Sequence, residues 1–157
     1  MGFGHSGPGR CSYVDIDSVL LQDPFPFFHG DADVWVANDF VAPAAGHGCT
    51  GLLAVRSTPR ATKLITAWAV AMAEKLQRNQ LVFNAVLEAQ RQADPSLDVR
   101  FLPQARFRRG KEFKLPADVL AKSVVAHEVV WVHANFLIGL VPKIVRLRSL
   151  GLWPAAI

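Results

Sequence analysis

The sequence predicts an α/β domain, a layered sheet with flanking helices. Short apolar segments typical of strands alternate along the chain with segments whose apolar residues recur at helical spacing. The chain has 157 residues, which is the length of one ordinary domain. Hydrophobic residues make up 51% of it and charged residues 19%, a composition that excludes global disorder.

Three strands are predicted in the first third of the chain. The first runs from Cys11 to Leu21 and ends at the turn signal Asp23-Pro24. The second covers residues 33–37. The third covers residues 51–55 and is short and apolar enough to lie in a buried parallel sheet. Residues 41–50, rich in Ala and Gly, are expected to form the loop before it.

Two helices follow. Pro59 is expected in the first turn of one helix. Its predicted apolar face consists of Leu64, Ile65, Trp68, Met72 and Leu76. Asn79 is predicted to cap a second helix that ends near Arg91. The residues expected to face inward there are Leu81, Val82, Ala85, Val86 and Ala89.

The last third predicts two more strands and a final helix. Residues 97–102 are expected to form one strand, and residues 123–132 another, interrupted at His127-Glu128. The final helix is predicted over residues 140–150, with Pro142 in its first turn.

Composition narrows the possible partners. The net charge of +4 is compatible with a small anionic substrate. No dense basic stripe with interleaved aromatic residues is present, so we expect no nucleic-acid partner. No run of 18 apolar residues exists, so no membrane anchor is predicted in this chain. Cys11 and Cys49 fit no zinc ligand set, and they form either one disulfide bridge or two free thiols.

Asp15 and Asp17 are the most informative residues. Two carboxylates two positions apart point to the same side of an extended chain, and apolar residues flank this pair on both sides. A divalent cation is an obvious partner for such a pair. A second pair with the same spacing, Asp31 and Asp33, follows Gly30 and is interpreted as turn capping.

The segment from Asp15 to Phe27 reads Asp-Ile-Asp-Ser-Val-Leu-Leu-Gln-Asp-Pro-Phe-Pro-Phe. It resembles the metal-binding strand and the following proline turn of the nucleotide-diphospho-sugar transferase domain. The type it resembles is glycosyltransferase family 77, which is found in plant and algal cell-wall glycosylation. Further blocks match in the same order. They are Ala32–Val34 with Asp39, Thr50–Arg56, Asn79–Asn84, Phe107 with Gly110, His133–Asn135 with Gly139 and Lys143, and Leu150–Trp153.

This resemblance implies an A-type, Rossmann-like glycosyltransferase fold, a nucleotide-sugar donor, and Mn²⁺ or Mg²⁺ bound by Asp15, Asp17 and His133. A mixed set of carboxylate and imidazole ligands favours Mn²⁺ over Ca²⁺. His133 follows the strand-like residues 129–132, so it should emerge at a strand end, where α/β sheets bind ligands.

The resemblance also implies donor-binding residues, each of which has a second interpretation. Lys143 lies near a predicted helix start, four residues after Gly139. It would hold a phosphate oxygen, or it is an ordinary surface lysine. Asn135 would bond the donor or shape its turn. Gly51, after Thr50, would allow the backbone to approach a sugar closely.

Gln80 would lie beside the anomeric carbon. The family usually has Asp before this Gln, whereas the chain has Asn79, which either caps its helix or takes a weakened part in catalysis. Cys49 stands where the family usually has Asn.

The function expected is a metal-dependent, retaining hexosyl- or pentosyltransferase acting on a glycan or glycoprotein, with a Golgi location implied by the resemblance. The alternative is a non-catalytic remnant that binds a glycan or a partner protein. We expect residues 1–10 to be a flexible segment unlike the family, residues 11–157 to form the domain, and the family's N-terminal β-α-β portion to be missing.

Overall fold

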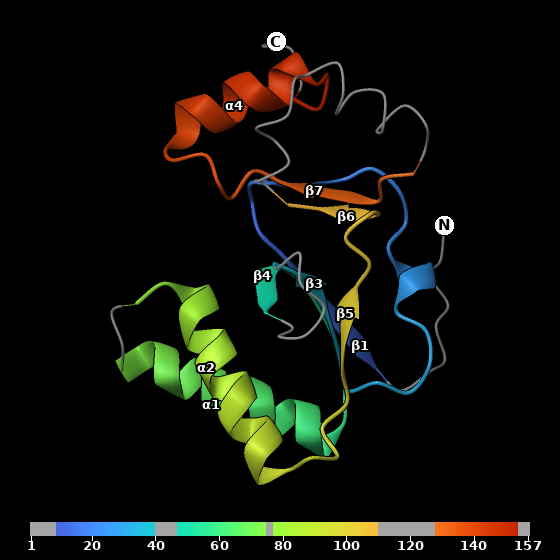
Figure 1. Cartoon of the computed structure of the whole chain (residues 1–157), viewed down its shortest axis with the longest axis vertical. Coiled ribbons are helices and arrows are strands. Elements are labelled where there is room, and N and C mark those ends of the chain that lie inside the picture. Colours follow the sequence, from blue (N-terminus) through green and yellow to red (C-terminus); the bar gives the residue numbers. More distant parts are fainter. Residues whose placement is uncertain (1–8, 40–46, 75–76, 110–127, 154–157) are drawn as a thin grey trace. The chain divides into compact units, whose positions relative to one another are not determined.

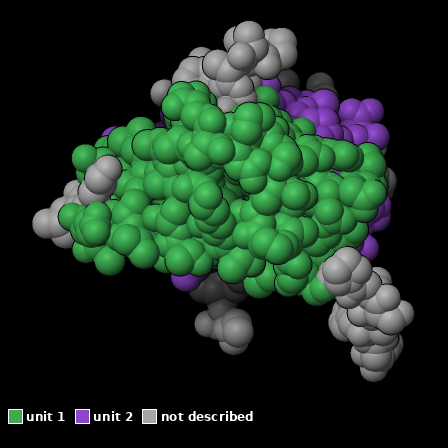
Figure 2. Space-filling model, turned by 90° about the horizontal axis from the view of Figure 1, so that it is seen from below, with its two compact units in different colours: residues 1–14, 28–101 green, residues 15–27, 102–157 purple. Residues whose placement is uncertain are grey.

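The structure, a computed structural model, has two compact units (Figure 2), and each contains its own sheet (Figure 1). Unit 1 comprises residues 1–14 and 28–101, and unit 2 comprises residues 15–27 and 102–157. The residues that the structure describes are 9–39, 47–74, 77–109 and 128–153. The predicted α/β class is confirmed, because sheets and helices are combined in a mixed layered arrangement.

Unit 1 contains a four-stranded sheet in the order β1-β4-β3-β5. The strands are β1 (Arg10–Val14), β3 (Val34–Asn38), β4 (Gly48–Arg56) and β5 (Val99–Leu102). β4 pairs antiparallel with both β1 and β3, so the expectation of a parallel strand at residues 51–55 was wrong. Its buried run of apolar residues arises because both of its neighbours are strands and one face lies under helices.

Two helices, α1 (Pro59–Glu74) and α2 (Asn79–Ala93), pack against one face of this sheet (Figure 1). The prediction that Asn79 caps α2 was wrong. The N-cap is Arg78, and Asn79 lies inside the first turn of the helix. Leu81 was expected to face inward but is 54% exposed. The helix instead buries Phe83, whose ring packs edge-on against Trp68 at 5.0 Å. The large aromatic side chain therefore sets which face is turned to the core.

Unit 2 contains a three-stranded sheet in the order β2-β7-β6, followed by a helix. The elements are β2 (Ser18–Leu20), β6 (Phe107–Arg108), β7 (Trp131–His133) and α4 (Leu140–Ser149). β7 is antiparallel to β2 and parallel to β6. Leu147 of α4 packs with Val129, Val132 and Ala134 in the core of this unit.

The single strand predicted from Cys11 to Leu21 was wrong. It divides into β1 and β2, which belong to different sheets, and a turn at residues 15–18 separates them. The Ser18 amide closes this turn by donating to the Asp15 carbonyl at 3.1 Å. The turn signal Asp23-Pro24 is real, and the 3-10 helix Phe25–Phe27 follows it. Of the strand predicted over residues 123–132, residues 123–127 lie outside the described part.

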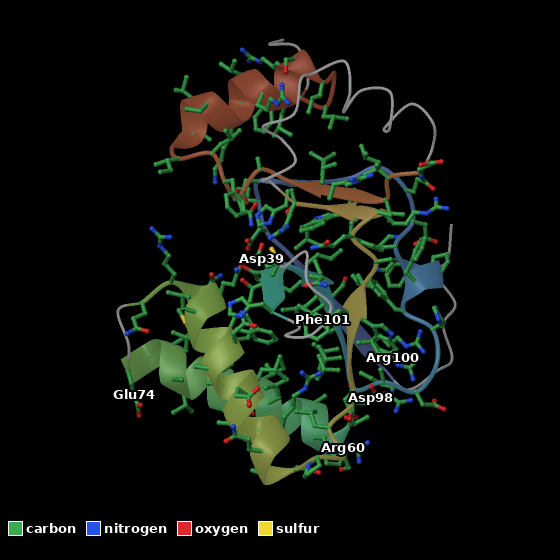
Figure 3. All side chains as sticks on the ribbon, viewed as in Figure 1. Asp39, Arg60, Glu74, Asp98, Arg100 and Phe101 are labelled. Atoms are coloured by element: carbon green, nitrogen blue, oxygen red, sulfur yellow. The ribbon has the colours of Figure 1, made fainter. Side chains whose placement is uncertain are left out.

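Asp33 is the buried polar centre of unit 1, and it does not cap the turn after Gly30 as expected. Its carboxylate accepts from Thr58 Oγ1 at 2.6 Å, from Arg60 Nε at 2.8 Å and from the Asp98 amide at 3.0 Å. Arg60 and Asp98 are labelled in Figure 3. One carboxylate therefore connects the start of β3, the start of α1 and the segment before β5.

Both cysteines are free thiols, Cys11 exposed and Cys49 buried. Cys11 lies opposite Val55, six residues along β4 from Cys49, which is roughly 20 Å in an extended strand and too far for a disulfide. Among the described residues, no helix has the length and apolarity required to cross a bilayer.

Candidate functional site

Asp15, Asp17 and His133 come together in unit 2. One ligand atom from each lies within 4.8 Å of the others. The turn at residues 15–18 presents the two carboxylates, and the pairing of Ser18 with His133 brings β7 alongside. The Ala134 amide donates to the Asp17 carbonyl at 3.1 Å and fastens the turn to the end of β7. Backbone pairing across more than a hundred residues thus builds the cluster.

Asp17 is the centre of the cluster. His133 Nε2 lies 3.1 Å from Asp17 Oδ1 and 3.5 Å from Asp15 Oδ2, while Lys143 Nζ lies 2.5 Å from Asp17 Oδ2. The hydrogen bond from His133, opposed by partial burial and aided by Lys143, holds the pKa of the Asp17 carboxyl far below its usual range. Asp17 is therefore an anion at neutral pH. Its side chain is 20% exposed, which leaves the cluster accessible to a ligand.

The donor set fits a divalent cation. Two carboxylates and one imidazole suit Mn²⁺, and Mg²⁺ also accepts oxygen ligands of this kind. His133 Nε2, which lies between the two carboxylates, would turn its lone pair to the cation, so its remaining ring proton would sit on Nδ1. Three protein ligands leave coordination positions for water and phosphate oxygens.

The predicted donor-binding residues of unit 2 surround the start of α4. Gly139 is the N-cap of α4 and has φ of 88°, a conformation that favours glycine. Lys143 is in the first turn, and its ammonium group contacts Asp17. Asn135 lies in the turn that the Leu137 amide closes on the Ala134 carbonyl at 3.3 Å. A helix N-terminus beside a lysine is favourable for an anion. The phosphate-binding roles stay predictions.

Asn79, Gln80 and Gly51 belong to unit 1. Gln80 Nε2 donates to Asp39 Oδ2 at 2.8 Å, and Asp39 is labelled in Figure 3. Asn79 Oδ1 accepts from the Gln80 amide at 2.7 Å and from Thr50 Oγ1 at 3.4 Å. These contacts tie the first turn of α2 to β4 and to the end of β3.

Gly51 lies in an irregular part of β4. Val36 pairs with Leu53, but the next residue, Ala37, pairs with Cys49, so residues 50–52 bulge out of the β3–β4 ladder. Bulges of this kind are frequent next to active sites, where they change the direction of a side chain. Here the bulge includes Thr50, which contacts Asn79.

Sequence reasoning assigned no role to Asp39 or Asn84, although both lie in the blocks that resemble the family. Asn84 accepts from the Gly48 amide at 2.7 Å and donates to its carbonyl at 2.8 Å, which fixes the start of β4 against α2. Asp39 orients Gln80. The signal for Asn84 was its position one helical turn after Gln80 on the same face.

Comparisons with known proteins identify the family of the chain. The family model described as nucleotide-diphospho-sugar transferase matches residues 12–147. Three Arabidopsis thaliana proteins are each 26% identical to the chain over 90% of its length. They are UDP-D-xylose:L-fucose alpha-1,3-D-xylosyltransferase 3, UDP-D-xylose:L-fucose alpha-1,3-D-xylosyltransferase MGP4, and UDP-D-xylose:L-fucose alpha-1,3-D-xylosyltransferase. The matched region covers 42–44% of these relatives. No solved structure matches the chain significantly.

Proposed function

Because the chain belongs to the nucleotide-diphospho-sugar transferase family, we propose that it transfers a sugar from a nucleotide-diphosphate donor to a glycan or glycoprotein, with a bound divalent cation and with retention at the anomeric carbon. The observation that carries the proposal is the cluster of Asp15, Asp17 and His133, whose ligand atoms lie within 4.8 Å of one another. A diphosphate leaving group is stabilised by positive charge near its oxygens. A cation bound to this cluster, together with the ammonium group of Lys143, would supply that charge.

Asp15, Asp17 and His133 would hold the cation, which supplies charge neutralisation for the departing diphosphate. Lys143 contacts the Asp17 carboxylate, which would also bind the cation. Because the cation would replace this contact, the ammonium group of Lys143 would become available to a phosphate oxygen. Gly139 and the first turn of α4 would offer backbone N–H groups to the same phosphate. Each of these groups lies within unit 2.

Gln80 and Gly51 keep the roles that the resemblance implies, which are contacts with the reacting sugar. Gln80, held by Asp39 at 2.8 Å, would place its amide beside the anomeric carbon. The Thr50–Gly51 bulge would bring backbone close to the sugar, because glycine carries no side chain at that point.

The relatives' names indicate the substrates to test first. They act on UDP-D-xylose and L-fucose, so we propose UDP-xylose as the donor and a fucose-bearing glycan as the acceptor. A pentosyltransferase of plant or algal cell-wall glycosylation acting in the Golgi would be consistent with that choice.

We expect the chain to transfer xylose from UDP-xylose to an L-fucoside in the presence of Mn²⁺, with chelation stopping the reaction. UDP release measures turnover, mass spectrometry identifies the product, and the anomeric proton coupling gives its configuration. Turnover that survives complete chelation would exclude the metal role, and a product of inverted configuration would exclude retention.

A non-catalytic glycan- or partner-binding module is the second candidate function, and Asn79 is the observation in its favour. An asparagine can form hydrogen bonds but cannot neutralise positive charge at the anomeric carbon, and Cys49 likewise replaces the amide expected there. Metal-dependent turnover of any UDP-sugar would exclude this candidate.

Replacing Asn79 by Asp separates the two functions. Asn79 Oδ1 only accepts hydrogen bonds, from Gln80 and Thr50, and a carboxylate accepts both equally well. The fold should therefore be preserved, and negative charge in the first turn of α2 is favourable. We expect turnover to rise, by about 10²-fold if the carboxylate stabilises charge in the transition state. Equal turnover of both proteins, with unchanged donor binding, would exclude a catalytic role at this position.

A further inference from the structure

An apolar pocket of about 530 Å³ lies in unit 1 beside β1. It exists because α1 and α2 pack mainly over β3, β4 and β5. In β1, Cys11 and Tyr13 pair with Val55 and Leu53 of β4, so the four side chains share one face of the sheet. This face forms the floor of the pocket, and α1 forms one wall with Ile65, Trp68 and Met72.

Asn79 is one of the polar residues that line the pocket, with Ser12, Arg56, Ser57, Thr62 and Thr66. Its Oδ1 atom is already occupied by the Gln80 amide and Thr50 Oγ1. Among the described residues, Nδ2 of Asn79 has no hydrogen-bond partner. An amide N–H group in the lining of a largely apolar pocket is a ready donor for a hydroxyl oxygen of a ligand.

We propose that this pocket binds the acceptor of the transfer and selects acceptors whose sugar is attached to an apolar or aromatic group. The inference rests on the proposed function and names the substrate class of that reaction. The sugar would lie at Asn79, where a hydroxyl can accept from Nδ2. The attached apolar group would lie against Tyr13 and Trp68, since aromatic walls bury much area at little entropic cost.

The size of the pocket supports a ligand of this class. Its volume lies within the range typical of small-molecule sites, roughly 300–1,000 Å³. A sugar alone would leave the apolar floor of Leu53 and Val55 uncovered, whereas an apolar compound alone would leave Asn79 Nδ2 without a partner. A glycoside with an apolar aglycone satisfies both parts.

The first test measures binding in the absence of donor and metal. Isothermal titration of the whole chain with 4-nitrophenyl fucoside and methyl fucoside should give a dissociation constant about tenfold or more lower for the nitrophenyl compound, because it buries an additional ring. 4-Nitrophenol, which lacks the sugar, should bind more weakly than the nitrophenyl glycoside. Equal affinity for the two glycosides, or equal affinity for nitrophenol and its glycoside, would overturn the proposal.

Two variants locate the binding site. Thr66 lines the pocket, so Thr66→Trp should fill it and abolish the preference for the nitrophenyl glycoside. Val70, one helical turn further along α1, is 54% exposed and is not part of the lining. Val70→Trp is therefore the matched control and should leave binding unchanged. The same loss of affinity in both variants would place the ligand elsewhere.

The cysteines provide a direct readout that does not depend on catalysis. Cys11 is exposed and lines the pocket, whereas Cys49 is buried and does not. At a ligand concentration ten times the dissociation constant, maleimide labelling of Cys11 should be about tenfold slower. Protected Cys11 without sugar transfer would support the pocket and contradict the proposed function. Sugar transfer with unprotected Cys11 and equal use of both glycosides would support the function and overturn the pocket.

Discussion

Replacing both Asp15 and Asp17 by Ala is expected to abolish Mn²⁺-dependent binding of UDP. The two carboxylates supply both oxygen ligands of the Asp15–Asp17–His133 cluster, and one imidazole alone does not hold a hard cation. The single variant Asp17→Asn should weaken Mn²⁺ binding by about 100-fold or more. Loss of a residue that only orients a metal ligand already weakens metal binding by roughly 10- to 100-fold, and loss of a ligand should weaken it at least as much. Isothermal titration with Mn²⁺, with and without UDP, measures both effects.

Asp23→Asn is the matched control for this experiment. Like Asp17→Asn, it removes one negative charge from unit 2, and Asn preserves the turn in which the Asp23 carboxylate accepts from the Phe25 amide at 2.9 Å. Metal binding should be unchanged in this variant. Unchanged Mn²⁺ and UDP binding in the Asp15/Asp17 double variant would show that the metal assignment is wrong.

Trp131 reports the same event by fluorescence. Its ring centre lies 5.2 Å from that of His133, so a paramagnetic Mn²⁺ ion bound to His133 should quench its emission. The quench should be lost in Trp131→Phe and in the Asp15/Asp17 double variant. Quenching that persists in the double variant would place the ion outside the cluster.

Replacing Asp33 by Ala is expected to give the largest loss of stability. The variant removes a fully buried carboxylate that accepts from Thr58, Arg60 and the Asp98 amide. The lost hydrogen bonds and the unsatisfied Asp98 amide should cost about 3 kcal/mol or more in the free energy of unfolding. Urea denaturation followed by circular dichroism measures this cost.

Asp31→Ala is the control, because its side chain is 97% exposed even though it pairs with Arg56 at 2.9 Å. Exposed ion pairs contribute little, so no measurable loss of stability is expected. A loss as large as that of Asp33→Ala would contradict the role assigned to burial.

Asp33 also predicts a dependence of stability on pH. Burial alone would raise the pKa of its carboxyl, but the hydrogen bonds from Arg60, Thr58 and the Asp98 amide outweigh it and lower the pKa. A lowered folded-state pKa contributes stability above the unfolded value, near pH 4, and this stability is lost as the pH falls through the folded value. Asp33→Asn should therefore flatten the acid side of the stability curve by at most about 1.4 kcal/mol per pH unit. An unchanged acid slope would contradict this assignment.

Local sequence patterns predicted the helices and singled out the two carboxylates of the Asp15–Asp17–His133 cluster. Helical spacing after Pro59 placed α1, and Pro142, expected in a first turn, placed α4, because a helix is built from contacts within a few residues. The two carboxylates at Asp15 and Asp17 stood out because a charged pair inside an apolar segment needs a partner.

Only the tertiary structure decided which strands pair and which face each helix turns inward. The segment from Cys11 to Leu21 has a continuous strand pattern, yet β1 and β2 join different sheets, since strand pairing depends on partners that are distant in the chain. The same is true of Asp33, whose three donors come from Thr58, Arg60 and Asp98. Long-range pairing leaves no local signature. The sequence by itself singled out Asp15 and Asp17 as candidate metal ligands, whereas the pairing of β2 with β7 brings His133 to them.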